Sequence, residues 1–269
     1  MIDYVLLGEV MEYYKSIGYE EIDVPWLINE KYDLLTRPNN KNSCIIDNDG
    51  RHFVASAEQG FLSTCLTNGM KYNKVFVSCT PCIRLNDCDD NYHQETFMKI
   101  ELSAVSDTEE LAQDIVKNIL INTKALFNNI TNKKVYIEKI EFKPSICHFD
   151  LMIDGIEVGS YGYREIDGCY YVFGTGLALP RLSKFIDDSG YHKSGFVKYN
   201  TGTLLKIKEE INECIDAEKQ NDKLLLICEL ADVIGAVKMY IDNNDIGVNI
   251  NDLDKFSQKT INAFKKGKR

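Results

Sequence analysis

The stretch from residue 147 to residue 164 gathers chemically useful side chains at one end of an apolar strand pair. It carries acidic groups, the hydroxyl of Ser160 and the guanidinium of Arg164. Further along, a run of small and apolar residues begins at Gly174 and ends at Arg181. Carboxylate and hydroxyl oxygens suit a hard divalent cation, and arginine suits phosphate or carboxylate oxygens. The layout indicates a site for ATP, a divalent metal and a carboxylate substrate.

Another arginine, Arg84, ends an apolar run that we expect to form a strand. A polar loop with His93 follows, and Phe97 and Glu101 lie four residues apart on the returning strand, so they share one face. A guanidinium group can neutralise a phosphate through two parallel hydrogen bonds, and an aromatic ring can stack on a purine. The alternative is that Arg84 and Phe97 only stabilise the hairpin.

Acidic residues recur at helical spacing in the C-terminal part of the chain. Glu210 and Glu213 are three positions apart, as are Glu229 and Asp232, and Glu209 precedes the first pair. Like charges at this spacing oppose a helix by ~0.2–0.5 kcal/mol per pair, and a bound cation would offset that repulsion. A magnesium site is one interpretation, and a solvated helix face is the other.

Composition limits the classes of protein to consider. The chain has 269 residues, 44% of them hydrophobic, and a formal net charge of −10. This charge argues against a surface that binds a polyanion, because phosphate contacts need clustered lysine and arginine. No apolar run approaches the ~20 residues of a membrane-spanning helix. Nine scattered cysteines, with no secretory leader, indicate reduced thiols and a cytoplasmic location.

One group of thiols offers a different chemistry. Cys79, Cys82, Cys88 and His93 could hold zinc or take part in redox reactions. Cys79 ends a strand-like run, however, and the sequence has no second cysteine pair at zinc-finger spacing. We therefore favour a structural role for these cysteines.

An antiparallel sheet flanked by helices must position the first set of residues. Apolar spacing predicts helices at 4–17, 57–68 and 107–128. Strands are predicted at 21–24, 52–55, 75–85, 96–105, 135–142, 147–153, 156–163 and 169–173. Asp-Gly turns at 154–155 and 167–168 favour hairpins. The fold class is therefore α+β, and we expect this core to span residues 1–192.

The pattern then changes to helix alone. Apolar residues predict helices near 204–215, 224–241 and 253–264, which would form a small all-α domain at residues 198–269. Three short helices make a thin core. We therefore expect this domain to pack on a second copy of the chain, as a homodimer, or on the first domain.

Several segments resemble the three motifs of class II aminoacyl-tRNA synthetases. They are Tyr19–Pro25 (YEEIDVP), Phe76–Arg84 (FVSCTPCIR) with His93–Glu101 (HQETFMKIE), and Gly174–Arg181 (GTGLALPR). The resemblance spans the first domain. It implies the catalytic core of that family, which uses ATP and magnesium to activate an amino acid as an acyl-adenylate.

The resemblance also implies roles for single residues. Pro25 would lie at a dimer interface, and Phe97 would stack on adenine. Arg84 would hold the α-phosphate and Arg181 would meet the γ-phosphate, so these two arginines would be the catalytic residues. Their charge and alignment would stabilise the in-line displacement of pyrophosphate.

Other implied positions complete this site. Glu157 and Ser160 would bind magnesium. The ATP and substrate pocket would also include His93, Glu101, Gly174 and Gly176. The chain departs from the family pattern at Asn86 and Pro180, where acidic residues are usual.

The segment from residue 149 to residue 164 most resembles the aspartyl and asparaginyl branch of this family. In that branch, the arginine seven residues after the metal-binding glutamate binds the carboxylate of the substrate side chain. Arg164 stands seven residues after Glu157. The resemblance thus implies an aspartate-like substrate. The alternative is a sheet-edge arginine paired with Glu165 or Asp167.

The acidic helices resemble all-α nucleoside-triphosphate pyrophosphohydrolases of the MazG and phosphoribosyl-ATP pyrophosphohydrolase type. The resemblance rests on Glu-Glu-x-x-Glu at 209–213 and Glu-Leu-Ala-Asp at 229–232. It implies that Glu210, Glu213, Glu229 and Asp232 bind magnesium, with Glu210 also catalytic and Glu209 assisting.

The leading hypothesis is a bifunctional enzyme that activates an amino acid and hydrolyses a nucleoside triphosphate. The substrates would be small molecules. A tRNA partner is not expected, because the first motif begins almost at Met1 and acidic helices follow the core. Two alternatives remain open: the core is a binding or dimerising module and only the C-terminal domain is catalytic, or the chain senses a ligand without turnover.

Overall fold

The computed structural model describes residues 2–36, 46–68, 74–85, 92–141, 145–186, 190–192 and 194–267. Residue contacts divide the chain into two compact units, Met1–Ile186 and Asp187–Arg269. The second unit thus begins at Asp187 and contains His192, whereas the sequence-based expectation ends the core at residue 192. Among the described residues, no helix is both long enough and apolar enough to span a bilayer.

A seven-stranded sheet forms the centre of the first unit, with strand order β1-β4-β5-β9-β8-β7-β6. Strand β1 pairs with β4 in parallel, and the other neighbours pair in antiparallel fashion. The strands are β1 (Glu20–Glu21), β4 (Phe76–Ile83), β5 (Thr96–Ser106), β6 (Tyr136–Lys139), β7 (Cys147–Ile153), β8 (Ile156–Ile166) and β9 (Cys169–Leu179). A small sheet pairs β2 (Leu27–Ile28) with β3 (His52–Phe53).

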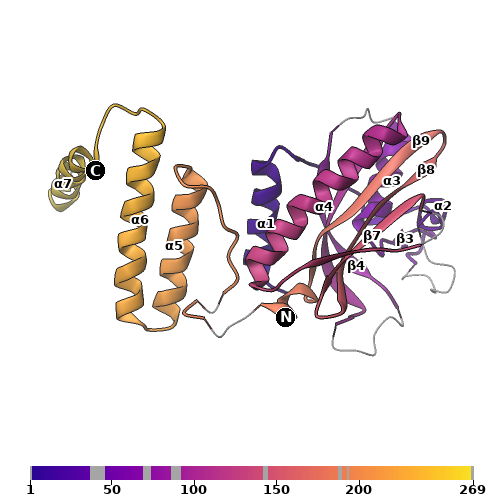
Figure 1. The fold of residues 1–269 in the computed structure, drawn as a ribbon, viewed down its shortest axis with the longest axis horizontal. Coiled ribbons are helices and arrows are strands. Elements are labelled where there is room, and N and C mark those ends of the chain that lie inside the picture. The colour runs from indigo at the N-terminus through magenta and orange to yellow at the C-terminus, as the bar shows by residue number, and fades with distance from the viewer. Residues whose placement is uncertain are drawn as a thin grey trace. The chain divides into compact units, whose positions relative to one another are not determined.

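Helices α1 (Tyr4–Ser16) and α4 (Glu109–Thr131) lie together on one face of the large sheet (Figure 1). Tyr14 of α1 donates a hydrogen bond to the carbonyl of Gly176 in β9, and its hydroxyl lies 3.0 Å from Thr123 of α4. Helix α3 (Ala57–Asn68) packs on the opposite face, where its Phe61 contacts Tyr171 of β9. Two short helices, α2 (Glu30–Asp33) and the 3₁₀ helix η1 (Leu182–Phe185), complete the unit. The expected α+β class is confirmed.

Tight turns connect β7 to β8 and β8 to β9. Asp154 and Gly155 have φ values of 50° and 80°, and Asp167 and Gly168 have 51° and 78°. Two consecutive positive φ angles define the hairpin turn whose twist matches paired strands. The two Asp-Gly pairs therefore form the hairpins that the sequence predicts.

Two irregularities in the pairing change which side chains face the same way. Met152 pairs with Glu157 but Leu151 pairs with Gly159, so Val158 is an extra residue in β8. Likewise Ile100 pairs with Leu177 and Glu101 with Thr175, which leaves Gly176 as the extra residue. A bulge of this kind lets two residues three positions apart share one face of a sheet.

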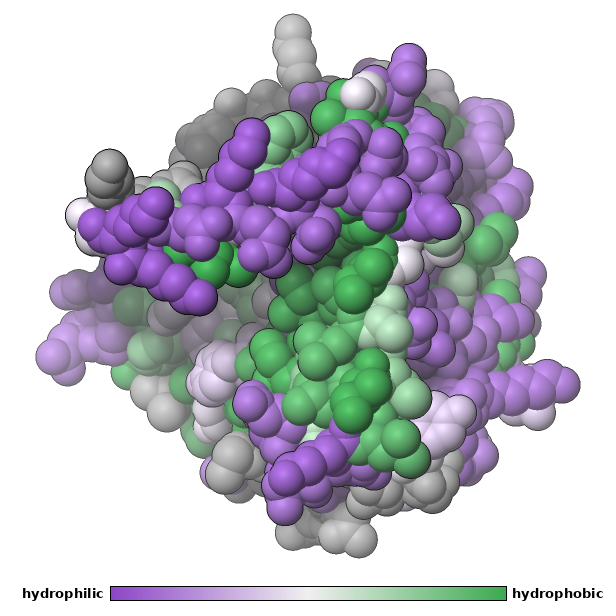
Figure 2. Space-filling view, turned by 90° about the vertical axis from the view of Figure 1, so that its left-hand side faces the viewer, coloured by the Kyte–Doolittle hydropathy of each residue, from purple (hydrophilic) through white to green (hydrophobic). Residues whose placement is uncertain are grey.

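The second unit consists of helices α5 (Leu204–Lys219), α6 (Lys223–Asn243) and α7 (Ile250–Lys265). Thr203, Asp222 and Asn249 cap their first turns by accepting backbone hydrogen bonds. Helices α5 and α6 pack against each other, and many of their apolar side chains stay exposed. Figure 2 looks onto this region and shows a strip of apolar side chains between hydrophilic ones.

Candidate functional site

A cavity of about 400 Å³ opens on the sheet face opposite α1 and α4. Residues of β5 and β9 form its floor: Phe97, Lys99 and Glu101 on β5, and Phe173, Thr175 and Ala178 on β9. Strand side chains alternate between the two faces, and the extra residue Gly176 shifts this alternation along β9. The segment before α3 and the first turn of that helix form one wall. Most of the predicted residues of the first unit line this cavity: Arg84, His93, Phe97, Glu101, Glu157, Ser160, Arg164 and Arg181.

Arg84 directly follows β4 and is held from two sides. Its Nε donates a hydrogen bond to the carbonyl of Ala55 at 3.0 Å, and its guanidinium carbon lies 5.0 Å from the centre of the Phe97 ring. Its backbone N–H also donates to Glu95. The side chain is therefore pre-positioned at the cavity, with Phe97 supporting it through a cation–π contact.

Arg181 lies just after β9 and pairs with Glu157. Its Nη1 lies 3.3 Å from Oε1 of Glu157 and donates a hydrogen bond to the Glu157 carbonyl at 3.2 Å. The Arg181 side chain is 16% exposed and the Glu157 side chain 46% exposed. Arg84 and Arg181 thus come from distant parts of the chain to line one cavity, each already in contact with protein groups.

Ser160 lies beside two residues for which the sequence suggests no role. Its hydroxyl is 2.8 Å from Nε2 of His148, and Oδ1 of Asp150 is 3.2 Å from the same nitrogen. His148 and Asp150 are on β7, and Asp150 pairs directly with Ser160 on β8. Because both oxygens face one nitrogen, the group forms a polar cluster in the wall and not a relay through both sides of the ring.

A buried ion pair lies on the cavity floor. Lys99 Nζ is 2.7 Å from Oε2 of Glu101, and the Ser56 hydroxyl donates to the same oxygen at 2.8 Å. Glu101 is 1% exposed, and burial raises its carboxyl pKa while Lys99 acts in the opposite direction. Glu101 therefore connects the sheet to the segment that precedes α3.

Arg164 is also paired within the protein. Its Nη2 lies 2.9 Å from Oε1 of Glu58 in α3, and its guanidinium carbon lies 4.6 Å from the centre of the Phe173 ring. Neither Glu165 nor Asp167, the partners considered from the sequence, takes this place. The Arg164–Glu58 pair joins β8 to α3 across the cavity wall.

Gly174 and Gly176 lie on the other face of the sheet. A Cβ atom at Gly174 would be 2.7 Å from Ile119 of α4, and one at Gly176 would be 2.7 Å from Ile100 and 3.0 Å from Tyr14 of α1. The residue between them, Thr175, lines the cavity instead. The two glycines therefore allow the helices to approach the sheet closely, and the ATP contact that the resemblance implies for them stays a prediction.

Glu157 and Ser160 do not offer a ready pair of magnesium ligands. The bulge at Val158 brings both to the cavity, but Glu157 already pairs with Arg181 and Ser160 already contacts His148. Among the described residues, the groups of three or more His, Cys, Asp or Glu side chains that could hold a metal ion all lie in the second unit. As arranged, the pair does not fit the ion.

Asp33 and Gln59 are two further lining residues that sequence reasoning missed. Asp33 is fully buried, accepts a hydrogen bond from Gln59 at 2.7 Å and lies 3.0 Å from Nδ1 of His52. Gln59 accepts one from the backbone of Ala55. The polar run Ser-Ala-Glu-Gln at 56–59 stands at the start of a predicted helix. This feature of the sequence could have predicted that the segment lines the site.

The second unit gathers the four predicted magnesium ligands around one buried carboxylate. Ligand atoms of Glu210, Glu229 and Asp232 lie within 4.8 Å of one another, and so do those of His192, Glu213 and Glu229. Glu229 belongs to both groups. Oxygen-rich sets of this kind suit magnesium, so the residues present fit that ion.

Glu209 has a structural role beside this cluster. It is 2% exposed, accepts a hydrogen bond from the backbone of Tyr199 at 2.7 Å and pairs with Lys206 at 2.6 Å. Lys206 also lies 2.6 Å from Glu210. Burial, followed by the charges of Glu210 and Glu209, raises the pKa of Glu213 to about 8. The crowded carboxylates therefore disfavour the ionised form of Glu213, and a bound cation would favour it.

The cysteines of β4 do not form a metal or redox centre in the described part of the chain. Cys79 and Cys82 are free thiols three positions apart on a regular strand, and strand side chains that far apart point to opposite faces. Burial raises the pKa of Cys79 to about 11. Cys88 lies outside the described residues, as does Asn86.

Comparison with solved structures identifies the fold. Seryl-tRNA synthetase from Pyrococcus horikoshii complexed with ATP aligns with a TM-score of 0.61 and 12% identity over 77% of this chain and 54% of that chain. Serine-tRNA ligase from Naegleria fowleri in complex with AMP aligns with 0.58 and 14% over 71% and 49%. A pyrrolysyl-tRNA synthetase from Desulfitobacterium hafniense aligns with 0.54 and 11% over 67% of each chain.

The fold is therefore that of class II aminoacyl-tRNA synthetase catalytic cores. The alignment spans about half the length of the two seryl-specific enzymes. No protein-family model matches the chain, and no curated protein sequence matches it. At these identities the likeness concerns the fold, and the function must be argued from the cavity.

Proposed function

We propose that the first unit activates the carboxylate of an amino acid with ATP. A carboxylate oxygen would attack the α-phosphorus, the bond to pyrophosphate would break, and an acyl-adenylate would form. The observation that carries this proposal is that Arg84 and Arg181 line one cavity. The cavity volume of about 400 Å³ lies in the range of small-molecule sites, ~300–1,000 Å³.

Arg84 and Arg181 would stabilise the phosphates by charge. Positively charged groups that are fixed before the reaction stabilise the charge that develops during phosphoryl transfer. Arg84 is fixed by Ala55 and Phe97. Arg181 would exchange its contact with the half-exposed carboxylate of Glu157 for a phosphate oxygen.

Phe97 would support the adenine ring, and His93, which also lines the cavity, would lie beside it. One face of the Phe97 ring is already covered by Arg84. An aromatic ring has two faces, so a purine can stack on the other one. Adenine, Phe97 and Arg84 would then form a layered arrangement at the end of β4 and the start of β5.

Arg164 is the residue that would select an aspartate-like substrate. Its position in the cavity supports this role, whereas its 2.9 Å pair with Glu58 means that a substrate carboxylate would have to share the guanidinium. A neutral or basic amino acid would instead leave the pair intact. Measuring activation with each of the twenty amino acids decides between these substrates.

Amino-acid-dependent exchange of labelled pyrophosphate into ATP tests the proposed activation. We expect exchange in the wild-type chain and a loss of about 10²–10³-fold in Arg84→Ala and in Arg181→Ala, since each removes one preorganised charge. Arg51→Ala is the matched control, because Arg51 is exposed and its ion-pair partners in the described part of the chain are Asp47 and Asp49. Full exchange in Arg84→Ala would contradict the assigned role.

We infer that the second unit is a nucleoside-triphosphate pyrophosphohydrolase. Glu210, Glu213, Glu229 and Asp232 would hold magnesium, which when bound neutralises phosphate charge and orients the triphosphate. Glu210 is fixed by Lys206 at 2.6 Å, so its carboxylate can orient an attacking water. The shared position of Glu229 in the cluster supports this proposal.

Magnesium-dependent release of monophosphate and pyrophosphate from nucleoside triphosphates tests the second proposal. We expect Glu229→Gln to lose at least about 10²-fold in rate, because it removes the charge common to both ligand groups. Glu218→Gln, at an exposed position of the same helix pair, is the control. Unchanged turnover in Glu229→Gln would remove the ligand assignment.

A second candidate function follows from the Arg181–Glu157 pair. If that pair persists when ATP is present, the first unit binds a ligand without turnover, and only the second unit is catalytic. This outcome predicts nucleotide hydrolysis without pyrophosphate exchange for any amino acid. A chain that only senses a ligand would show neither activity.

A further inference from the structure

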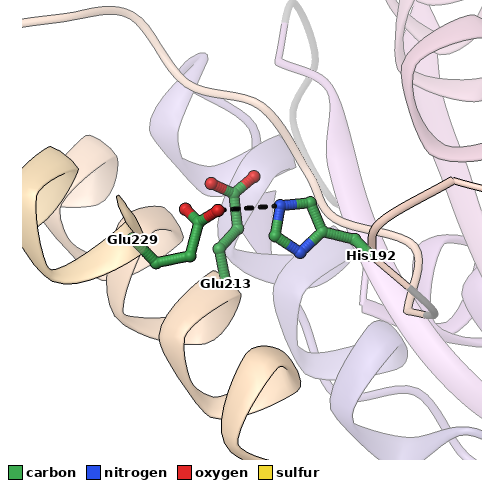
Figure 3. Close-up of side chains that lie close together, drawn as sticks. All are labelled: His192, Glu213 and Glu229. Carbon is green, nitrogen blue, oxygen red and sulfur yellow. Dashed lines mark ion pairs between the residues drawn. The ribbon is translucent and has the colours of Figure 1, made fainter. Parts of the chain in front are cut away.

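His192 lies in the segment before α5 and faces the carboxylates of two helices. Its Nε2 is 3.5 Å from Oε1 of Glu229 on α6. Figure 3 shows the imidazole ring and the side chains of Glu213 and Glu229 turned toward one another. One ligand atom of each residue lies within 4.8 Å of the other two. An imidazole nitrogen therefore joins a cluster that the sequence predicts to be made of oxygens alone.

Glu229 is the residue that most needs a cation here. It is only 5% exposed, and among the described residues its carboxylate accepts no hydrogen bond. Its only charged partner in that part of the chain is His192, at a distance longer than a hydrogen bond. A metal ion coordinated by this carboxylate would neutralise the charge of Glu229 and of the carboxylates beside it.

The other ring nitrogen of His192 faces a second carboxylate. Nδ1 lies 3.6 Å from Oδ2 of Asp216, which is buried at 4% exposure. Asp216 is held in place by hydrogen bonds from Ser194 and Gln220, both at 2.8 Å. Metal-ligating histidines characteristically direct their second nitrogen to a carboxylate, which fixes the ring and its tautomer. For His192 to adopt this arrangement, its Nδ1 contact with Asp216 would have to shorten, because at 3.6 Å it is longer than a hydrogen bond; Nε2 already faces the cluster.

We propose that His192, Glu213 and Glu229 bind a divalent first-row transition-metal ion. The position is adjacent to that of Glu210 and Asp232, because Glu229 belongs to both groups. One imidazole with two carboxylates favours such an ion over magnesium, which prefers oxygen ligands. The inference deepens the proposed pyrophosphohydrolase by giving its site a second type of ligand, and it can be tested without turnover.

Electron paramagnetic resonance of the full chain with Mn²⁺ as the probe tests this assignment directly. We expect bound Mn²⁺ to show coupling to a ¹⁴N nucleus, which changes to a ¹⁵N coupling when only the histidines carry ¹⁵N. The chain has four histidines, so variants can identify the source. His192→Asn should lose the coupling, and His148→Asn, in the first unit, should keep it.

Affinities provide an independent measurement. We expect His192→Asn to weaken Mn²⁺ binding tenfold or more while changing Mg²⁺ binding less than about twofold, and Asp216→Asn to weaken Mn²⁺ binding by about 10–100-fold. Circular dichroism of each variant verifies the helices. Wild-type protein that binds no Mn²⁺, or binds it without histidine coupling, overturns the proposal even if His192→Asn does not fold. If the bound Mn²⁺ shows histidine coupling but the chain hydrolyses no nucleotide, the proposed pyrophosphohydrolase activity is contradicted while the proposed metal site is supported.

Discussion

Ion pairs hold three cationic side chains of the cavity in place before any ligand enters. In two of these pairs both side chains are largely buried: Lys99 with Glu101, and Arg164 with Glu58. The third, Arg181 with Glu157, has a carboxylate that is almost half exposed. Solvent screens exposed pairs, and they contribute little to stability. Arg181 is therefore the side chain that can most easily change partner when a phosphate arrives.

Thiol reactivity gives a prediction for the strand that carries Arg84. Burial raises the pKa of Cys79 to about 11 and that of Cys65 to about 12, so both stay protonated in the folded chain at pH 8.5. The thiolate is the reactive form, and we expect iodoacetamide to modify both at least about 100-fold more slowly than a free cysteine. Mass spectrometry of the alkylated peptides measures this difference.

Cys228 is the internal control for that experiment, because its side chain is exposed on α6. It should be modified at once, and Cys79 and Cys65 only after unfolding. The sign of the linked stability effect follows from the raised pKa. The contribution of each thiol is complete below its unfolded pKa of about 9 and is lost as the pH rises through about 11 for Cys79. Rapid modification of native Cys79 at pH 8.5 would contradict this account.

Only some of the residues that form the two sites could be predicted from the sequence. Arg84 and Arg181 end recognisable motifs, so their importance could be predicted from sequence. His148, Asp150 and Glu58 could not be found in this way, because each gains its role from strand register or from a helix far away in the chain. His192 was missed for the same reason: its partners lie on helices that follow it.

At the scale of elements, the local pattern places the main helices and strands, but several ends differ: β8 and α4 each continue three residues further than predicted, β6 is shorter, and β9 is much longer. The helix at 57–68 and the strand at 147–153 end where the sequence predicts, whereas β9 continues from residue 173 to Leu179. Its small residues resemble a loop because glycine is a poor strand former. Packing of Tyr14 and Ile119 against the glycines, a tertiary effect, explains why the strand continues.

Gly176→Ala tests this packing role. The added methyl group would lie 2.7 Å from Ile100 and 3.0 Å from Tyr14, so we expect the free energy of unfolding to fall by about 1–3 kcal/mol. Urea unfolding monitored by circular dichroism measures the change. If Gly176 instead contacts ATP, the variant would keep its stability and raise the KM for ATP.

Gly8→Ala is the matched control in the same unit. Gly8 lies within α1, and a Cβ atom there meets nothing within 4 Å. Alanine favours a helix over glycine by up to about 1 kcal/mol, so this variant should be as stable as the wild type or more so. Destabilisation by both substitutions would mean that the unit tolerates no added methyl group, and the packing argument would fail.

At the scale of the whole molecule, the apolar face of α6 leads us to propose a homodimer. Leu224, Ile227, Leu230 and Ile234 are all exposed and recur at helical spacing, so they form one stripe. Monomeric proteins rarely expose apolar patches of more than a few hundred Å². We expect light scattering after size-exclusion chromatography to give twice the mass of one chain.

Ile227→Lys should weaken that dimer. Burial of one isoleucine contributes about 1.5–3 kcal/mol, so the dissociation constant should rise by at least about tenfold, while the exposed position leaves the folded chain intact. Lys223→Ala, at the start of the same helix, is the control. A wild-type chain that remains monomeric at high concentration would contradict this proposal.

The bulge at Val158 bears on how related chains would be aligned. Glu157 and Ser160 reach the cavity together because one residue between them is left out of the ladder. A chain that lacked this extra residue would have a regular strand, and its glutamate and serine, now two positions apart, would still face the same way. Evolution can therefore shorten this strand by one residue without rebuilding the wall of the cavity, and relatives with different motif spacings can share the same site.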